Sequence, residues 1–485
     1  MAKIIPLHKN NGEKTDQTKY RPIALLPVFS KVIEKVMARA LNKHLEQNKL
    51  YSDKQHGYRR NRSTATALIQ LQEDILSKFE ESKSSALLCF DSSAAFDTVT
   101  HSILLDKLRL YGASEGVINW FSSYLEDRFQ YCELGGKRST TTKILQGVFQ
   151  GSVLGPLLYI LYINCIVVLE DELCQLYLYA DDTNARITLS GNNQMNQAKI
   201  QEKAQQMQEY MDAHHLKFNS DKTQILIKKK GINNTHKELN LTMNGKVINQ
   251  SESVKVLGIV ISQDEKYEEY LITGEKSMLK FLNKRLNMLK ILSKHADFKT
   301  RKALAEGLIL SKIDYCVTLW GITINSILDQ IQKVQNKTVR VVFGKKDYRA
   351  VTLTQLFKQL KWLKIKETRK YHDTICLHTM LTFQTPQSIA KKFNTHTRHH
   401  HNTRHSANRF RLTAETTSLN AQRSNGFVCR AARHWAHLSN EITMTSPPRW
   451  LFKDYVRCAI GGWEWKDETG EFIWWHRENE TFPKN

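Results

Sequence analysis

The sequence predicts a mixed α+β protein whose second half is mainly helical and strongly basic. As far as about residue 265, short apolar runs bounded by turn residues alternate with stretches of helical apolar spacing. Beyond about residue 275, the apolar spacing is helical. The 485 residues provide for about three domains or subdomains and for a sizeable buried core.

The charge balance indicates a polyanionic partner. Lys and Arg number 71 against 48 Asp and Glu, which gives a formal net charge of +23. Such an excess is typical of proteins that bind nucleic acid or an anionic membrane face, and a merely basic soluble protein is the alternative. The longest apolar run, residues 153–169, is interrupted by Pro156 and Asn164, so it predicts a buried helix and no membrane span. Nucleic acid is therefore the favoured partner.

Cysteine usage and the first residues argue against a secreted, disulfide-stapled protein. The eight cysteines are scattered, and none forms a C-x-x-C pair, which argues against a zinc ribbon and for a reducing compartment. The first residues contain no apolar stretch of the signal-peptide type.

Helical and extended patterns alternate through the first part of the chain. The spacing of apolar residues from Phe29 to Leu50 predicts a helix. Residues 85–91 predict a short buried strand, and residues 101–111 and 114–126 predict helices. The apolar positions of the first helix are Val32, Ile33, Val36, Met37, Leu41 and Leu45.

Further strands and helices follow, with turn residues between them. Gly135-Gly136 and Asn244-Gly245 are favourable pairs for tight hairpin turns. A polar amphipathic helix is predicted at residues 193–215. Strand patterns occupy residues 129–136, 140–147, 174–189, 223–230, 239–248 and 253–262.

The second half carries most of the unusual basic segments. The helix predicted at 276–294 interleaves basic residues with an apolar stripe, which suits either a nucleic-acid-binding face or an ordinary amphipathic helix. No Asp or Glu occurs between Thr374 and Ala414. The His-rich run at 397–405 lacks cysteine and helical spacing, so it favours RNA contact over a metal cluster.

Two acidic sites combine carboxylates with strand ends. Asp91 ends a buried apolar run and is followed by Asp97, while Asp181 and Asp182 lie between two apolar runs. If the hairpin of the second site lies beside the strand that ends at Asp91, three carboxylates converge. Such a cluster suits two Mg²⁺ ions and phosphoryl transfer, whereas solvated turn residues or a helix N-cap are the alternatives.

Seven segments of the sequence, which include both acidic sites, resemble the motifs of reverse transcriptases. The order and spacing agree across about residues 3–265. The helical half resembles the region past the palm in jockey-like and related non-LTR elements, in segments such as LILSKIDYCVTLWG, QKVQNKTVRVVFG and HNTRHSANRFR. The palm and fingers segments are KYRPIALLPVFSKVIEKV, SDKQHGYRRNRSTATAL, FDSSAAFDTV, GVFQGSVLGPLLYILYIN, YADD, LKFNSDKTQIL and SVKVLGIVI.

The resemblance implies an α+β right-hand polymerase with a helical, basic C-terminal region. Residues 1–265 would form the fingers and palm, with the fingers at about 1–80 and 110–145 and the palm in the rest of 80–265. Residues 266–345 would form a helical thumb. Residues 346–485 would form a basic region in contact with nucleic acid.

The implied activity is RNA-directed DNA polymerisation for a non-LTR retrotransposon. The implied partners are an RNA template, a DNA primer and dNTPs, without a membrane, and the oligomeric state is left open. Family analogy further implies target-primed reverse transcription, and hence a nuclear protein with a cytoplasmic ribonucleoprotein stage. No endonuclease segment precedes the fingers motifs in this sequence, so DNA nicking is not expected of it.

The resemblance also implies roles for the acidic residues. Asp91, Asp181 and Asp182 would be the catalytic triad and would bind two Mg²⁺ ions, with Mn²⁺ as the alternative. Asp91 and Asp181 would be the main metal ligands.

Four residues match positions that handle the incoming nucleotide. Phe96 matches an aromatic steric gate that would collide with a ribose 2′-hydroxyl, and core packing is its alternative. Lys9 and Arg21 match fingers residues that hold the triphosphate, although a solvated loop would explain Lys9 equally well. Lys222 matches a lysine near the departing pyrophosphate, a possible proton donor, with a surface lysine as the alternative.

The remaining matches concern the backbone around the substrates. Gln150 matches the residue that lines the nucleotide and template pocket, and Gly151 would allow close backbone approach. Leu257 and Gly258 match the primer grip, with a plain β-turn as the alternative. Arg59 is predicted to contact the template or the fingers.

Several positions depart from the family pattern. Phe149 replaces the proline that usually precedes Gln150, which removes a preset backbone angle. Ser92, Thr100 and Cys165 also depart from the usual residues. These departures favour, as the first rival hypothesis, an inactive or domesticated remnant that only binds nucleic acid. A group II intron maturase is the second rival hypothesis, and a basic scaffold protein is the third.

Overall fold

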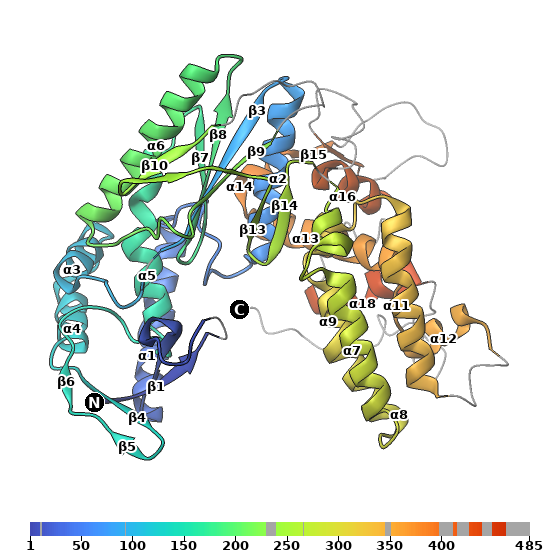
Figure 1. The fold of residues 1–485 in the computed structure, drawn as a ribbon, viewed down its shortest axis with the longest axis horizontal. Helices are drawn as coiled ribbons and strands as arrows, with labels where there is room; N and C mark the ends of the chain where they lie inside the picture. The colour runs from blue at the N-terminus through green and yellow to red at the C-terminus, as the bar shows by residue number, and fades with distance from the viewer. Residues whose placement is uncertain are drawn as a thin grey trace. The chain divides into compact units, whose positions relative to one another are not determined.

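The computed structural model contains two compact units (Figure 1). Unit 1 comprises Met1–Ala67 and Glu81–Leu257, and unit 2 comprises Leu68–Glu80 and Gly258–Asn485. The chain changes unit at residue 257, where the sequence predicts a change at 265. Residues 68–80, which the sequence predicts as part of the fingers, group with unit 2. The structure describes residues 1–9, 12–92, 94–228, 239–264, 266–344, 351–396, 411–414, 426–438 and 449–461.

Unit 1 is built around a five-stranded sheet with the strand order β12-β9-β3-β8-β7. The central strand, β3 (Ser84–Phe90), is buried along its whole length, as its apolar run predicts. It pairs antiparallel with β8 (Asp182–Leu189) on one side and with β9 (Gln224–Lys228) on the other. β7 (Cys174–Tyr179) and β12 (Gln250–Ser251) form the two edges.

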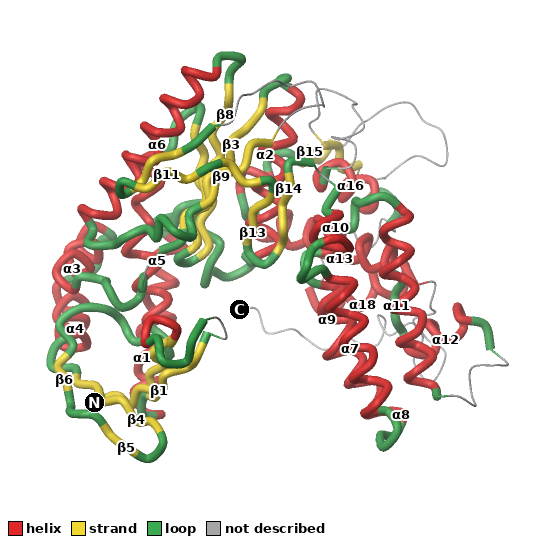
Figure 2. The backbone as a smooth tube through the Cα atoms, viewed as in Figure 1, coloured by secondary structure: helices red, strands yellow, loops and turns green. Residues whose placement is uncertain are grey.

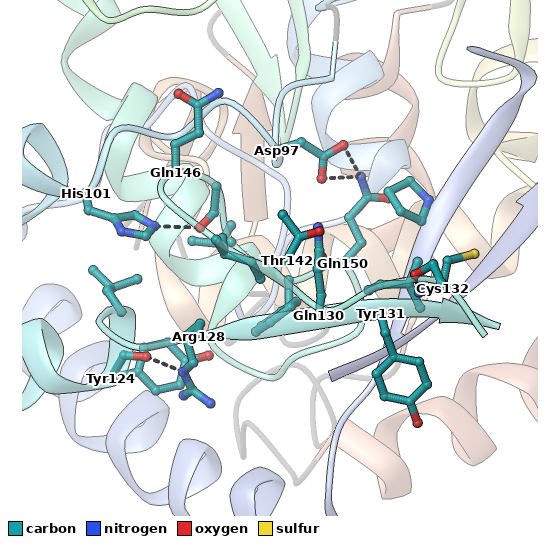
Figure 3. Close-up of a pocket in the computed structure, with 18 of the residues that line it drawn as sticks. Asp97, His101, Tyr124, Arg128, Gln130, Tyr131, Cys132, Thr142, Gln146 and Gln150 are labelled. Atoms are coloured by element: carbon teal, nitrogen blue, oxygen red, sulfur yellow. Dashed lines mark hydrogen bonds between the residues drawn. The ribbon is translucent and has the colours of Figure 1, made fainter. Parts of the chain in front are cut away.

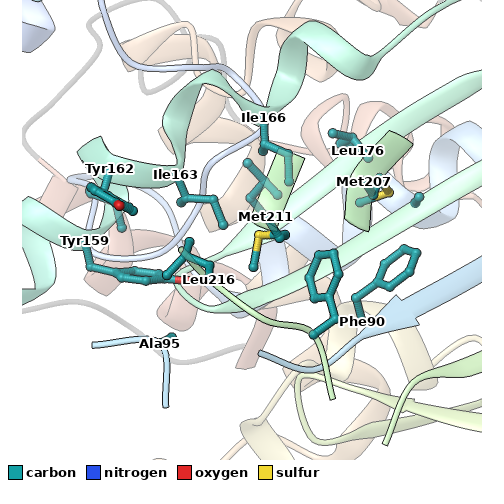
Figure 4. Packing of buried hydrophobic residues seen from close by; sticks show 14 of the residues in the cluster. Phe90, Ala95, Tyr159, Tyr162, Ile163, Ile166, Leu176, Met207, Met211 and Leu216 are labelled. Atoms are coloured by element: carbon teal, nitrogen blue, oxygen red, sulfur yellow. The ribbon is translucent and has the colours of Figure 1, made fainter. Parts of the chain in front are cut away.

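Two helices supply the apolar layer against this sheet. α5 (Gly155–Ile163) is buried at eight of its nine residues and continues into a 3-10 turn, Asn164–Leu169. α6 (Asn193–Ala213) is amphipathic, and Met207 and Met211 on its inner face join the core beside Phe90 and Leu176 (Figure 4). The buried helix predicted at 153–169 and the helix predicted at 193–215 are therefore confirmed. Among the described residues, none of the helices combines the length and the apolar composition that a membrane crossing requires.

A second sheet in unit 1 joins the first residues of the chain to a hairpin that lies far along the sequence. β1 pairs antiparallel with β2 and parallel with β4. Gly135 and Gly136 close the hairpin between β4 and β5 with φ angles of +58° and +78°, which glycine tolerates best. The predicted return strand at 140–147 is shorter than expected, with only β6 paired to β4. The strands are β1 (Ala2–His8), β2 (Tyr20–Leu25), β4 (Phe129–Leu134), β5 (Lys137–Arg138) and β6 (Thr142–Lys143).

The first helix, α1 (Val28–Gln47), forms where the apolar spacing predicts it but buries a partly different face. Val32 and Val36 are 54% and 61% exposed, although their spacing predicts burial. Glu34 is buried instead, because its carboxylate accepts hydrogen bonds from the backbone N–H groups of the segment that opens α5. α3 (His101–Leu110) and α4 (Glu115–Leu125) confirm the next two predicted helices.

Shorter elements complete unit 1. β10 (Leu241–Met243) and β11 (Lys246–Ile248) form the predicted hairpin, with Asn244 and Gly245 at its turn. β13 (Ser253–Val256) is the last strand before the boundary of the unit. Together these elements confirm the strand patterns predicted between residues 239 and 256.

Unit 2 is mainly helical, as the sequence predicts beyond residue 275 (Figure 2). α7 buries Met278, Leu282, Leu286 and Leu289. Its lysines are exposed, and Arg285 is half-buried over the Phe281 ring. The His-rich run at 397–405 and the Trp-rich residues from 462 onward lie outside the described residues. Among the described residues between 278 and 461, the helices of at least eight residues are α7 (Met278–Leu292), α8 (Phe298–Ala305), α11 (Asn325–Phe343), α12 (Leu353–Leu360), α13 (Ile365–Phe383), α16 (Phe427–Trp435) and α18 (Arg449–Gly461).

The remaining elements of unit 2 are short, apart from the helix that enters it from unit 1. α2 (Thr64–Glu80) begins in unit 1, and its residues from Leu68 belong to unit 2. β14 (Ile259–Ser262) opens the second stretch of the unit. The other elements in the described part of the unit are α9 (Ser311–Asp314), α10 (Val317–Trp320), α14 (Gln387–Ala390), the antiparallel strands β15 (Phe393–His396) and β16 (Arg411–Ala414), and two π-helical turns, Glu269–Thr273 and Glu306–Leu310.

A buried ion pair joins two helices of unit 2. Asp373 of α13 is fully buried, and both of its carboxylate oxygens accept hydrogen bonds from Arg430 of α16, at 3.1 and 3.2 Å. The guanidinium also donates to the carbonyl oxygen of Thr318 at 2.6 Å, and His434 lies 3.4 Å from Asp373. The two charges are therefore paired and hydrogen-bonded within the protein, which is the condition under which a buried charge is tolerated.

Candidate active site

Strand pairing brings the acidic residues of the two predicted motifs together. In the register of β3 and β8, Phe90 lies opposite Thr183. Asp91 follows Phe90 and Asp182 precedes Thr183, so these two residues, far apart in the sequence, lie at the same end of the strand pair, and the charge of Asp91 raises the pKa of Asp182. β8 also pairs with β7, where Tyr179 lies opposite Asp182. The convergence that the sequence predicts for Asp91, Asp181 and Asp182 is thus a consequence of sheet topology.

Asp181 lies in the two-residue turn between β7 and β8. The other turn residue, Ala180, has a φ of +57°, in the left-handed region that non-glycine residues rarely adopt. Such a conformation persists only where the surroundings hold it in place. The turn is therefore held by contacts outside the hairpin itself.

Those contacts come from the segment before α2, which sequence reasoning did not link to the hairpin. Gln55 is fully buried, and its side-chain oxygen accepts hydrogen bonds from the backbone N–H groups of Gly57 at 2.8 Å and Ala180 at 3.0 Å. The backbone of the same segment bonds to Leu178 of β7. A side chain at Gly57 would collide with the backbone of Ala180. Gln55 therefore satisfies a buried N–H at the turn that carries Asp181.

Burial and neighbouring negative charges raise the pKa values of Asp181 and Asp182. Burial raises the pKa of Asp182 to about 6, with further contributions from the charges of Asp181 and Asp91. Burial and the charge of Asp91 also raise the pKa of Asp181, against the opposing effects of Arg21 and Lys222. The carboxylates are thus placed where negative charge is costly without a nearby cation.

A lysine lies beside the first carboxylate. Lys222 Nζ is 2.7 Å from a carboxylate oxygen of Asp91, and the backbone N–H of Asn219 donates to the Asp91 carbonyl at 2.7 Å. The structure therefore brings Lys222 to Asp91, and its predicted role beside the departing pyrophosphate stays a prediction. Within the part of the chain that the structure describes, no three His, Cys, Asp or Glu side chains form a group ready to hold a metal ion. Asp91 is ion-paired to Lys222 instead.

Phe96, Arg21 and Lys9, which are predicted to contact the nucleotide, each have contacts within the protein. Phe96 stacks on Tyr159 of α5, with ring centroids 4.8 Å apart, so its ring is fixed against the core. Arg21 lies on β2 and lowers the pKa of Asp181 electrostatically. Lys9 Nζ donates to the Thr18 carbonyl at 2.9 Å. Their contacts with nucleotide stay predictions.

The Gln-Gly loop packs against the second sheet. The carbonyl of Gln150 accepts a hydrogen bond from the backbone N–H of Ala24 at 2.7 Å. Gly151 has a φ of +117°, and a Cβ there would lie 2.7 Å from the Ala24 carbonyl oxygen. Glycine is therefore required by close approach of the protein backbone. Phe149, which replaces the usual proline, packs against the small core of β1 and β2.

A pocket of about 340 Å³ lies beside this loop (Figure 3). Asp97, His101, Arg128 and Gln150 contribute to its wall. Gln150 donates its side-chain nitrogen to both carboxylate oxygens of Asp97 at 3.1 Å. Burial raises the pKa of Asp97, while the Gln150 hydrogen bond and the charge of Lys9 lower it. Sequence reasoning noticed Asp97 but assigned it no role.

The structure gives Arg59, Leu257 and Gly258 local roles in the fold. Arg59 pairs with Glu46, donates to the Ser52 carbonyl and stacks on the Tyr51 ring, so its hydrogen-bonding groups are engaged within the protein. Leu257 and Gly258 have φ angles of +47° and +81° at the boundary between the units. Their geometry is that of a turn, and the role of primer grip stays a prediction.

Comparison with known proteins points to one family. A family model described as reverse transcriptase (RNA-dependent DNA polymerase) matches residues 8–261, more than half of the 485 residues. The chain is similar to the probable RNA-directed DNA polymerase from transposon BS of Drosophila melanogaster, with 28% identity over 78% of this chain and 42% of the relative. It is also similar to the RNA-directed DNA polymerase from mobile element jockey of the same organism, with 25% identity over 81% of this chain and 43% of the relative.

The chain thus spans less than half the length of these relatives. Among solved structures, it is similar to telomerase from Candida albicans in complex with a fragment of telomeric RNA. That likeness has a TM-score of 0.43 and 13% sequence identity, and it covers 79% of this chain and 64% of the other.

Proposed function

The chain belongs to the reverse transcriptase family, and from this membership we propose that it is an RNA-directed DNA polymerase of a non-LTR retrotransposon. The observation that carries the proposal is the meeting of Asp91, Asp181 and Asp182 at the ends of paired strands. Carboxylates around one turn suit template-directed nucleotidyl transfer, in which positioning and charge do most of the work.

We propose Mg²⁺ as the cofactor, in two ions, with Mn²⁺ as the alternative. The chemistry of the donors fits, because hard divalent cations prefer carboxylate oxygens and the charge of Asp91 raises the pKa of both Asp181 and Asp182. In the described structure these side chains do not form a ready metal-binding group, so binding would require them to turn toward the ions. Asp91, Asp181 and Asp182 would hold the ions, and Asp91 would exchange its Lys222 partner for them. When bound, the ions would favour attack by a 3′-hydroxyl and offset charge on the departing pyrophosphate.

The protein's own residues would do the remaining work at the site. Lys222 would hold a proton on Nζ beside the pyrophosphate once Asp91 is otherwise engaged. Phe96, held by its stack on Tyr159, would exclude the 2′-hydroxyl of a ribonucleotide. Arg21 and Lys9 would bind phosphate oxygens by charge-assisted hydrogen bonds.

The basic second half would bind the RNA template and DNA primer. The net charge of +23 favours polyanions, and exposed lysines of α7, such as Lys280 and Lys284, would displace counterions from phosphates. By analogy with the relatives, we further propose target-primed reverse transcription, a nuclear location and a cytoplasmic ribonucleoprotein stage.

Primer extension on poly(rA)/oligo(dT) with Mg²⁺ tests the proposal. We expect dTTP incorporation by the wild type and its loss in Asp181→Ala and Asp182→Ala. Asp212→Ala, which removes an exposed carboxylate from α6, is the matched control and should retain activity. Equal activity in all variants, or binding of the template-primer without extension by the wild type, would contradict the polymerase and favour an inactive remnant.

A further inference from the structure

Asp97 lies at the junction between the first acidic motif and the Gln-Gly loop. Backbone hydrogen bonds tie the two segments together on either side of it, from Gly147 N–H to the Val99 carbonyl at 2.7 Å and from Val148 N–H to the Phe96 carbonyl at 2.8 Å. A Cβ at Gly147 would lie 2.7 Å from the Asp97 carbonyl oxygen, so the loop backbone has no room to shift toward it. The loop is therefore held closely by its backbone.

The side chain of Gln150 retains a freedom that the backbone does not remove. The backbone carbonyl of Gln150 accepts a hydrogen bond from Ala24, but the side-chain amide could direct either its nitrogen or its oxygen toward a ligand. The two ends differ chemically, since the nitrogen donates hydrogen bonds and the oxygen accepts them. Which end faces a ligand therefore decides what the ligand must offer.

The carboxylate of Asp97 settles this choice. An ionised carboxylate only accepts hydrogen bonds, so it selects the amide nitrogen of Gln150, which lies 3.1 Å from both oxygens (Figure 3). The amide oxygen is left as the acceptor. Amide orientation is often ambiguous in protein structures, but an acceptor-only partner removes the ambiguity.

We propose that Asp97 is a positioning residue, which orients Gln150 so that its amide oxygen accepts a hydrogen bond from the incoming deoxynucleotide. This inference rests on the proposed polymerase function, because it gives Gln150 a nucleotide to bind. Asp97 acts through Gln150 and does not touch the nucleotide itself. Both oxygens of Asp97 accept a hydrogen bond from the Gln150 amide nitrogen, whereas Asp91 is paired with Lys222.

A double-mutant cycle on the full chain tests the inference. The variants are Asp97→Ala, Gln150→Ala and the double variant, and the readout is the KM for dTTP and kcat on poly(rA)/oligo(dT). A lost hydrogen bond to a charged group predicts that Asp97→Ala raises KM about tenfold while kcat changes little. Because Asp97 acts through Gln150, the double variant should be no worse than Gln150→Ala alone. The inference would be overturned if the KM increases of the two single variants multiply in the double variant, or if Asp97→Ala leaves KM unchanged.

Asp97→Asn separates orientation from packing. The substitution keeps the shape of the side chain, but an asparagine amide can donate to the Gln150 oxygen and allow the amide to invert. We expect Asp97→Asn to raise KM as much as Asp97→Ala, with Asp212→Ala as the unaffected control. Recovery of the wild-type KM in Asp97→Asn would show a packing role and overturn the inference.

A binding measurement keeps this test distinct from the test of the polymerase. With a primer ended by a dideoxynucleotide, dTTP forms a ternary complex without chemistry, and its Kd is measured for wild type and Asp97→Asn. A Kd about tenfold weaker in the variant supports the inference even where wild type fails to extend primers. Equal Kd values would overturn it, and the absence of any dTTP-dependent complex with wild type would overturn it together with the proposed function.

Discussion

The two units bury aspartates in opposite electrostatic settings. In unit 1, Asp181 and Asp182 lie beside Asp91, and burial together with like charge raises their pKa values. In unit 2, Asp373 is buried more completely, and burial alone would raise its pKa. The charge of Arg430 and hydrogen bonds from His434 and Arg430 outweigh burial, so the pKa of Asp373 is lowered.

Burial alone therefore does not define the role of an acidic residue. Asp373 has its countercharge within the fold, with Arg430 at 3.1 Å, and acts as a link between α13 and α16. Lys222, which is exposed, is paired with Asp91, and Lys222 and Arg21 act on Asp181 through their charges. A cluster of acidic residues with too little positive charge around it is a candidate site for a bound cation, whereas an acidic residue paired with an arginine is a structural link.

The largest effect is expected from Asp181→Asn, which keeps the shape of the side chain and removes its charge. We expect turnover in primer extension to fall by about a thousandfold, equivalent to ~4 kcal/mol of activation free energy. The melting temperature should stay the same or rise, because one of three like charges is gone. A variant that loses stability along with activity would show that Asp181, like Asp373, serves mainly to hold the fold together.

Asp373→Asn should produce the opposite pattern. It leaves Arg430 buried without its countercharge, which costs about 3–5 kcal/mol of the free energy of unfolding. Urea unfolding followed by hydrogen exchange in α13 and α16 measures this loss. The double variant Asp373→Leu, Arg430→Met should recover most of the stability, since it removes both charges. If Asp373→Asn unfolds no more readily than Asp212→Ala, the pair does not link the two helices as described.

Gln55→Leu tests how the turn of unit 1 is held without a countercharge. The substitution leaves the buried N–H of Ala180 without its acceptor, a cost of about 1–3 kcal/mol. We expect turnover to fall about tenfold with the KM for dTTP nearly unchanged, because the turn that carries Asp181 loosens. Gln55→Glu retains an acceptor but adds a fourth negative charge, so it should not restore turnover. Full activity in Gln55→Leu would show that the hairpin holds itself.

The smallest effect is expected from lowering the pH, which weakens the Asp373–Arg430 pair and so lowers the free energy of unfolding. The pKa of Asp373 is lower in the folded protein than the ordinary value of 3.8, so below about pH 4 the unfolded chain binds more protons. The stabilisation by the pair is therefore present above about pH 4 and is lost as the pH falls toward the pKa of Asp373 in the folded protein. The free energy of unfolding contributed by this group changes by at most ~1.4 kcal/mol per pH unit. Urea unfolding monitored by tryptophan fluorescence between about pH 3 and 6 measures this slope. Asp373→Asn should reduce this slope, because other carboxylates, such as Asp171, also have a lowered pKa. A variant with the wild-type slope would assign the whole dependence to those other groups.

Local patterns predicted much of unit 1 and its principal acidic residues. The apolar run before Asp91 and the two runs around Asp181 and Asp182 place these carboxylates at strand ends, because residues of a buried strand must be apolar on both faces. The helix at α1 also follows from its spacing, but its buried face does not. Glu34 is buried there because it bonds to residues 119 and 120 positions away, which no local pattern signals.

Neighbouring residues along the chain were enough to predict the order of strands and helices, the three aspartates at strand ends and the excess of positive charge. Packing in three dimensions was needed to establish which polar side chains satisfy one another: Gln150 with Asp97 across 53 positions, Ala180 with Gln55 across 125, and Arg430 with Asp373 across 57. A hydrogen bond between distant segments leaves no periodic trace in the chain, because its partners meet only after the sheets and helices have packed.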